Sequence, residues 1–270
     1  MVLIFGQSRR SLVHLTVLVV FSLSVGNVQG FGELRRLKIK LLSILGHEMN
    51  PEAIFRSADA VCFDVDSTLF TTEAIDELAD FLNKAEDVKN VTNQAMSGKM
   101  GLRQALKARL QIMKPSISDL QRFMAVRPAT LSPGVEDLIQ CLHKNKVHVY
   151  LISGGFRSLI LPKAKELNIP PENVYANRLM FYFDGSYADL DINEPTSDNF
   201  GKAKVIEDLK QQHGYKTVVM IGDGITDMEA CPPADICIGY GGNVVRPEVK
   251  SKADWFVMNF KELHDGYKKC

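Results

Sequence analysis

The sequence has no excess of charge of either sign. Its 270 residues include 32 Lys and Arg and 32 Asp and Glu, so the formal net charge is zero. Without a basic surplus nothing favours a nucleic-acid partner, and without an acidic tail nothing favours a basic partner. We therefore expect no nucleic-acid binding.

Cysteine is scarce, and the histidines are scattered. The five cysteines are odd in number, and none belongs to a Cys-x-x-Cys pair. They are Cys62, Cys141, Cys231, Cys237 and Cys270. This spacing indicates neither a zinc site nor a disulfide framework, and it fits a reducing compartment better than an oxidising one. The six histidines show no metal-ligand spacing either.

The apolar run near the amino terminus is short for a stable membrane span. It covers residues 11–21, follows Arg9 and Arg10, and leads into smaller residues, which is typical of a targeting segment. A second interpretation is an upstream extension of the gene model, with the functional start at Met49. Residues 1–49 are left out of the fold argument in both cases. We expect a cytoplasmic protein whose core does not enter a membrane, or a secretory or organellar location if residues 1–30 are a genuine targeting segment.

From about residue 50, short apolar runs alternate with segments that have apolar residues at helical spacing. After the first run, further strands are expected at residues 147–152, 218–221, 236–238 and 255–257. Strands that alternate with helices predict an α/β fold with a Rossmann-like parallel sheet and helices on both faces. The ligand site of such a sheet lies at the carboxyl ends of the strands, where the polar clusters of this sequence fall.

Residues 71–127 contain two apolar stripes at helical spacing and no strand-like run. They predict a small helical cap inserted after the first strand, with residues 50–70 and 128–270 forming the α/β core. A second, smaller insert is expected at residues 180–187, because Asp184-Gly185 between aromatic residues is typical of a β-hairpin. This hairpin either lines the site or braces the cap.

Two carboxylates, Asp64 and Asp66, follow the apolar run that is expected to be the first buried strand. Like charges held so close together cost energy unless they share a cation or a proton. Proteins tolerate that cost mostly at metal or catalytic sites. Taken alone, the pair is equally compatible with a strand-end turn or a helix cap.

Four motifs, in order along the chain, resemble those of the haloacid dehalogenase superfamily of phosphatases. They are Asp64-Val65-Asp66-Ser67-Thr68, Ser153-Gly154-Gly155, Lys202 and Gly222-Asp223-Gly224-Ile225-Thr226-Asp227. From about residue 52 to about residue 265 the chain is similar to the eukaryotic phosphoserine phosphatase family. The resemblance implies the haloacid dehalogenase fold and Mg²⁺-dependent hydrolysis of O-phospho-L-serine to L-serine and phosphate, the last step of L-serine biosynthesis.

The same resemblance assigns the chemistry to the carboxylates. Asp64 would be the nucleophile that forms an aspartyl-phosphate, and Asp66 would be the general acid and base. Mg²⁺ prefers oxygen ligands and would be held by the carboxylates of Asp64 and Asp223 and by the backbone carbonyl of Asp66. Asp227 would support this metal site from outside the direct ligands.

The substrate phosphate needs hydrogen-bond donors and positive charge. By resemblance, Ser153 supplies a hydroxyl, Gly154 and Gly155 supply backbone amides at an expected helix start, and Lys202 supplies a point charge. Thr226 matches a family position that helps to hold the substrate. Alone, each of these residues would be an ordinary turn or surface residue.

Selection of the substrate is expected in the helical cap. Glu73 matches the carboxylate that pairs with the substrate ammonium, and Arg109 matches the arginine that binds the substrate carboxylate in a fork. Met96 and Ser97 match the loop that lines the serine pocket. The family pattern has glycine where Ser97 stands, which leaves the shape of the pocket open at this point.

Three alternatives stay open. The first is a related phosphatase for another small phosphorylated amine or acid, although Glu73 and Arg109 together match the two charges of an amino acid. The second is a catalytically silent phosphoserine-binding protein, although such a protein typically loses its nucleophile or a metal ligand. The third is a secreted or membrane-tethered enzyme with another substrate. The soluble members of the family also suggest a homodimer.

Overall fold

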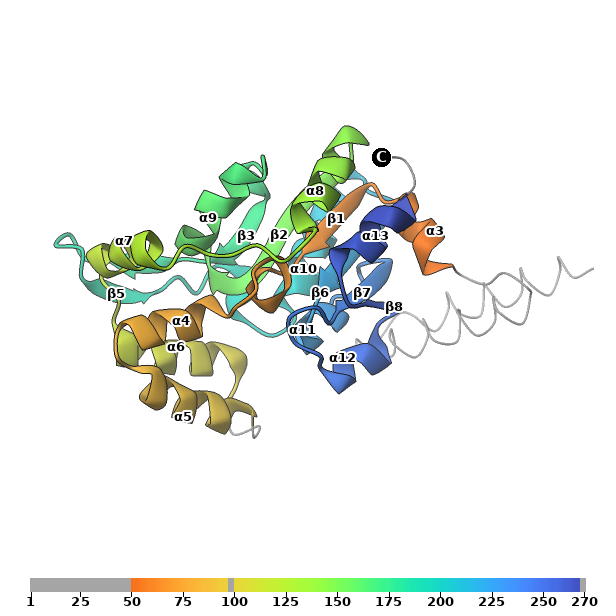
Figure 1. The fold of residues 1–270 in the computed structure, drawn as a ribbon. Helices are drawn as coiled ribbons and strands as arrows, with labels where there is room; N and C mark the ends of the chain where they lie inside the picture. Colours follow the sequence, from red (N-terminus) through yellow and green to blue (C-terminus); the bar gives the residue numbers. More distant parts are fainter. Residues whose placement is uncertain (1–49, 97–99, 268–270) are drawn as a thin grey trace, which may run out of the picture. The chain divides into compact units, whose positions relative to one another are not determined.

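The computed structural model describes residues 50–96 and 100–267, and Figure 1 shows their fold. Six strands form one sheet in the order β3-β2-β1-β6-β7-β8, and all its neighbouring strands are parallel. Its strands are β1 (Ala60–Phe63), β2 (His148–Phe156), β3 (Val174–Asn177), β6 (Val218–Gly222), β7 (Ile236–Tyr240) and β8 (Trp255–Val257). The predicted parallel α/β sheet is confirmed.

Helices cover both faces of this sheet. Because successive residues of a strand point to opposite faces, Val61 and Phe63 of β1 join one apolar core and Ala60 and Cys62 join another. The first core includes residues of α3 (Pro51–Arg56), α8 (Val135–Lys144), α9 (Arg157–Glu166) and α13 (Phe260–Tyr267). The second includes residues of α10 (Gly201–His213), α11 (Ile225–Met228) and α12 (Pro247–Lys252). Burial on both faces explains why β1 is apolar at every position.

Two details of the sheet differ from the prediction. The sequence predicts that β2 ends at Ile152 and that a helix starts at the glycines, whereas β2 continues to Phe156 and α9 begins at Arg157. The pairing of β2 with β3 shifts its register between Ser153 and Phe156, so the glycine pair lies in an irregular strand end. The strand β3 was not predicted, because it has only 4 residues and lies close to the hairpin.

The helical segment 71–127 has an apolar core of its own. It contains α4 (Ala74–Phe81), α5 (Ala85–Met96), α6 (Leu102–Met113) and α7 (Ile117–Val126). The side chains of Leu78, Leu110 and Phe123 pack there against Tyr187 and Leu190 of the hairpin formed by β4 (Leu179–Phe181) and β5 (Tyr187–Leu190). The limits proposed for the core and the cap stay predictions.

The antiparallel pairing of β4 with β5 confirms the predicted hairpin. The backbone N–H of Ile117 in α7 donates to the carbonyl of Gly185 at 3.0 Å, and Lys107 of α6 pairs with Asp189 of β5 at 3.0 Å. Figure 1 shows β5 beside α7. The hairpin therefore braces the helical segment.

Across the part of the chain that the structure describes, no helix combines the length and the apolar character needed to cross a membrane. The targeting-like segment and the choice between Met1 and Met49 lie outside the described residues. Cys62, Cys231 and Cys237 are not disulfide-bonded, whereas Cys141 takes part in a disulfide bond that the cysteine spacing does not predict.

Candidate active site

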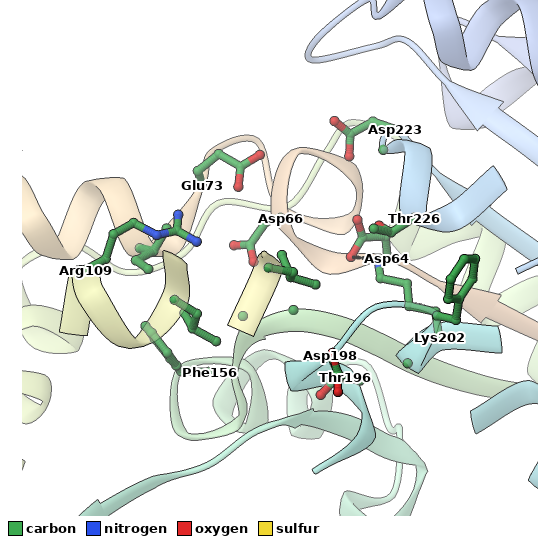
Figure 2. A pocket seen from close by; sticks show the side chains of 18 of the residues that line it. Asp64, Asp66, Glu73, Arg109, Phe156, Thr196, Asp198, Lys202, Asp223 and Thr226 are labelled. Atoms are coloured by element: carbon green, nitrogen blue, oxygen red, sulfur yellow. Dashed lines mark ion pairs between the residues drawn. The ribbon is translucent and has the colours of Figure 1, made fainter. Parts of the chain in front are cut away.

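The carboxyl ends of β1, β2 and β6 border a cavity of about 220 Å³. Residues at the start of α4 and along α6 line its other side (Figure 2). The sequence-predicted site residues that line it are Asp64, Asp66, Glu73, Arg109, Gly154, Gly155, Lys202, Asp223 and Thr226. A cavity at this edge of an open parallel sheet is where a ligand site is expected.

Asp64 is fixed to the sheet by its own backbone. It follows β1 directly, and its N–H donates to the carbonyl of Ile221 in β6 at 2.8 Å. Its Oδ1 accepts a 2.7 Å hydrogen bond from the N–H of Val65, which starts the turn over residues 65–69. The residue is only 8% exposed. Burial and these two hydrogen bonds hold its carboxylate in place at the cavity.

Lys202 joins two carboxylates that follow different strands. Its Nζ lies 2.7 Å from Oδ1 of Asp64 and 2.6 Å from Oδ1 of Asp227. Burial works against the Lys202 ammonium, but the charges of Asp227 and Asp64 outweigh it and raise its pKa. Lys202 therefore carries its positive charge at the Asp64 side of the cavity.

Asp66 has the environment of a proton carrier. Burial, the charge of Glu73 and the charge of Asp64 raise its pKa to about 7, although the N–H of Ala74 donates to its Oδ1 at 2.9 Å and opposes this shift. A carboxyl group with this pKa exchanges protons near neutral pH. Gly155 lies close beside it: a Cβ at this position would lie 2.4 Å from Asp66 Oδ2, so this carboxyl group would have to move.

Three carboxylates could hold a metal ion. Asp64, Asp223 and Asp227 each offer an oxygen, and these oxygens lie within 4.8 Å of one another. Such an all-oxygen set suits a hard divalent cation. Oδ1 of Asp223 accepts from the Thr68 hydroxyl at 3.0 Å, which orients this carboxylate. The Asp227 carboxylate also lies in the cluster, held by Lys202 and by the N–H of Gly224 at 2.9 Å.

The opposite side of the cavity carries the acidic Glu73 and the basic Arg109. Figure 2 shows Glu73 and Arg109 on one side, Asp64, Lys202 and Thr226 on the other, and Asp66 between them. Burial raises the pKa of Glu73 and lowers that of Arg109. Because each charge is partly desolvated, a ligand group of opposite charge would gain more there than in water.

The remaining predicted residues fall in different places. Ser153 is fully buried; its hydroxyl accepts from the N–H of Gly155 at 2.8 Å and lies 3.5 Å from Asp66 Oδ2. Met96 ends α5, but its side chain, like Ser97, lies outside the described residues. The structure therefore tests neither residue of the expected serine pocket.

Sequence reasoning missed Arg246, which also lines the cavity. Its Nη2 lies 2.9 Å from Oδ2 of Asp223 and 3.5 Å from Oε1 of Glu73. Thr196, Asp198 and Phe200 were missed as well, because they precede α10 in a segment without a recognisable motif. A signal for Arg246 was available in the Gly241-Gly242 pair after a predicted strand, which marks a loop at the same edge of the sheet.

Comparisons with known proteins agree with this geometry. The model of the haloacid dehalogenase-like hydrolase family matches residues 58–235. The phosphoserine phosphatase of Bos taurus is 51% identical over 210 residues, which cover 78% of this chain and 93% of the bovine protein.

Two solved structures have the same fold. One is a phospho-aspartyl intermediate analogue of phosphoserine phosphatase and the other a substrate-bound phosphoserine phosphatase complex. Each has a TM-score of 0.67 and 27% identity, with 77% of this chain and 98% of the solved chain covered. The chain thus belongs to the haloacid dehalogenase-like hydrolases and, among them, to the phosphoserine phosphatase family.

Proposed function

We propose that this chain hydrolyses O-phospho-L-serine to L-serine and phosphate. The observation that carries the proposal is the division of the cavity. One side holds the carboxylates Asp64 and Asp66 with Lys202, and the other side holds Glu73 and Arg109. The first set suits a phosphate ester, and the second suits the ammonium and carboxylate groups of an amino acid. The activity named for the relatives supports the same substrate.

Asp64 is the proposed nucleophile. Its carboxylate attacks phosphorus, the bond from phosphorus to the serine oxygen breaks, and an aspartyl-phosphate forms. The support that β1 and β6 give to its backbone keeps the carboxylate in place during the attack. Lys202, beside Asp64, offsets the negative charge that gathers there.

Asp66 is the proposed general acid and base. In the protonated form it donates its proton to the leaving serine oxygen. As a carboxylate it then takes a proton from the water that attacks the aspartyl-phosphate. The pKa of about 7 allows both forms at neutral pH.

Enzymes of this superfamily generally use a divalent metal, and the carboxylate cluster fits one. We infer that the ion is Mg²⁺ and that the carboxylates of Asp64 and Asp223 and the carbonyl of Asp66 hold it. When bound, it would neutralise charge between the substrate phosphate and the nucleophile. Asp227, which pairs with Lys202, would support the cluster without binding the ion directly.

Further donors beside the cavity are proposed to bind the phosphate oxygens. We assign to this role the Ser153 hydroxyl, the N–H groups of Gly154 and Gly155, and the Lys202 ammonium. Thr226, at the start of α11, is proposed to contact the substrate from the side of β6. Glu73 is proposed to pair with the substrate ammonium and Arg109 with its carboxylate, which makes the helical segment 71–127 the substrate-selecting cap.

The proposal is tested by measuring phosphate release from O-phospho-L-serine in the presence of Mg²⁺, beside a panel of other phosphomonoesters. Preferential turnover of phosphoserine supports it. Turnover of other esters only would keep the chemistry and reject the substrate. A folded protein without activity on any ester would favour the silent phosphoserine-binding alternative.

Removal of the metal is expected to stop phosphate release. With EDTA, Asp64 would have to approach an anionic phosphate without the charge that offsets the repulsion between them. The rate should fall to background and return when Mg²⁺ is added in excess over the chelator. Full activity after exhaustive removal of divalent ions would contradict the assigned metal site.

Replacement of Gly155 by alanine is expected to lower kcat/KM for phosphoserine by about 10-fold or more. The new Cβ would lie 2.4 Å from Asp66 Oδ2 and displace the proton carrier. Gly101→Ala is the matched control, since Gly101 does not line the cavity and a Cβ there would meet no atom within 4 Å. Equal activity of the two variants in the phosphate-release assay would mean that contact with Asp66 is not what Gly155 provides.

The compartment and the oligomeric state stay predictions. We propose a cytoplasmic site of action for the catalytic part, and a fusion of residues 1–48 to a reporter tests it directly. A homodimer would be recognised from the mass of the purified chain in solution.

A further inference from the structure

We propose that Asn243 is a positioning residue. It aligns the proposed general acid Asp66 through hydrogen bonds that clamp the backbone of the turn after β1. The inference rests on the proposed function. It concerns the loop between β7 and α12, which contributes Arg246 to the cavity. Asn243 itself reaches the backbone of the turn, not the cavity.

The amide of Asn243 contacts three oxygen atoms. Its Nδ2 donates to the carbonyl of Ser67 at 3.1 Å, to the carbonyl of Phe70 at 3.2 Å and to Oγ of Ser132 at 2.7 Å. Carbonyl oxygens only accept hydrogen bonds, so the NH₂ end of this side chain must face them. An aspartate of the same shape would place a carboxylate oxygen there and would be repelled.

Ser132 completes the clamp. Its hydroxyl donates to the carbonyl of Thr68 at 2.6 Å, and its N–H donates to the carbonyl of Leu69 at 2.9 Å. The four consecutive carbonyls of residues 67–70 are thus held by two residues, Asn243 and Ser132. Both ends of the helical segment meet there, because Phe70 forms a bridge with Leu131.

The same turn carries side chains that face the cavity or contact residues that line it. Asp66 faces the cavity, the Ser67 hydroxyl donates to Oε1 of Glu73 at 2.7 Å, and the Thr68 hydroxyl donates to Asp223. Ser67 has a φ of 54°, a left-handed conformation that a serine keeps only when its surroundings hold it. The bond from Asn243 to the carbonyl of Ser67 supplies such a hold.

The loop that carries Asn243 is itself fixed against the sheet. A Cβ on Gly241 would lie 2.5 Å from Cζ of Phe256, and one on Gly242 would lie 2.3 Å from the hydroxyl of Tyr240. The loop therefore packs closely against Tyr240 and Phe256, and a side chain at either glycine would force a neighbouring group to shift.

The nucleophile has a second support outside this clamp. Asp64 is held by β6 through its backbone N–H, whereas Asp66 lies within the clamped turn. Loss of Asn243 should therefore impair proton donation more than nucleophilic attack. Serine leaves as a strong base that needs a proton, while acetyl phosphate releases acetate, a weak base that does not.

The test compares Asn243→Ala and Asn243→Asp with the wild type on phosphoserine and on acetyl phosphate. We expect kcat/KM for phosphoserine to fall by roughly 10- to 100-fold, with the larger loss for Asn243→Asp, and that for acetyl phosphate by less than about 3-fold. Asn173→Ala is the matched control, because Nδ2 of Asn173 donates to the carbonyl of Val149 at 3.0 Å, outside the site. It should lower the melting temperature and leave both activities unchanged.

Equal losses on the two substrates would overturn the inference, since a general loss of folded enzyme lowers both. Wild-type activity of Asn243→Asp on phosphoserine would overturn it as well, because this variant keeps the shape and removes the donors. If the wild type released no phosphate from phosphoserine, the proposed function would fail and this inference with it.

Discussion

Replacement of Asp64 by asparagine is expected to lower phosphate release from phosphoserine by about 10⁴-fold or more. The amide is a far weaker nucleophile than the carboxylate, so no covalent phosphoenzyme can form in the usual way. The change keeps the shape of the side chain, and Oδ1 can still accept from the N–H of Val65. Steady-state phosphate release, together with the amount of acid-stable labelled enzyme after a brief reaction, measures the effect.

Asp198→Asn is a suitable control for this variant. Asp198 also lines the cavity, but its carboxylate pairs with Arg103 at 3.1 Å and is half exposed. We expect less than about 10-fold loss, since exposed ion pairs contribute little. Formation of labelled phosphoenzyme by Asp64→Asn at the wild-type level would contradict the assignment of the nucleophile.

Replacement of Lys202 by methionine is expected to impair both activity and folding. The ammonium pairs with Asp64 and Asp227 in a site where all three side chains are largely buried. Removal of one partner from a buried ionic group leaves uncompensated charge and typically costs about 3–5 kcal/mol of stability. The loss of charge beside Asp64, the proposed nucleophile, should also lower kcat by roughly 10²-fold or more. Thermal unfolding and phosphate release measure the two effects.

Lys204→Met is the control for the general effect of replacing a lysine by methionine. Lys204 lies two residues further along α10, and its pair with Asp208 at 2.6 Å is exposed. Such surface pairs contribute about 0–1 kcal/mol, so the control should unfold near the wild-type temperature and keep its activity. If Lys202→Met were as stable and as active as Lys204→Met, the buried ion pairs of Lys202 would contribute neither to stability nor to catalysis.

Much of the site was predictable because its residues follow strand ends. In a parallel sheet those ends meet at one edge, so Asp64, Gly155 and Asp223 come together as soon as the strands are identified. The electrostatic cost of two neighbouring carboxylates favoured a metal or catalytic site once the other motifs were recognised. Their individual roles came from the family resemblance and not from spacing.

Contacts that depend on register were not predictable. Arg246 follows β7, and its partner Asp223 follows β6, so their contact depends on the pairing of Gly222 with Gly239. Neither residue has a local pattern that points to the other. The same holds for Asn243, whose partners lie more than 100 residues away in the sequence.

The fold was predictable where apolar runs are long and less so where they are short. The continuous burial of β1 and β6 gave clear signals. The end of β2 did not, because the glycines there contribute no side chain to an apolar pattern. The support that the hairpin gives to the helical segment depends on tertiary packing of Tyr187 and Leu190, which no local pattern reveals.

The most direct test of the central claim compares three substrates that differ by one charged group. They are phosphoserine, O-phosphoethanolamine without the carboxylate, and 3-phosphooxypropanoate without the ammonium. If Arg109 and Glu73 bind these two groups, kcat/KM for phosphoserine should exceed that for either analogue by about 10²-fold or more, since each analogue lacks the charge that would pair with one of these two partly desolvated side chains. Arg109→Ala should reduce the preference over phosphoethanolamine in particular. Equal kcat/KM values for the three substrates would contradict the claim that this cavity selects phosphoserine.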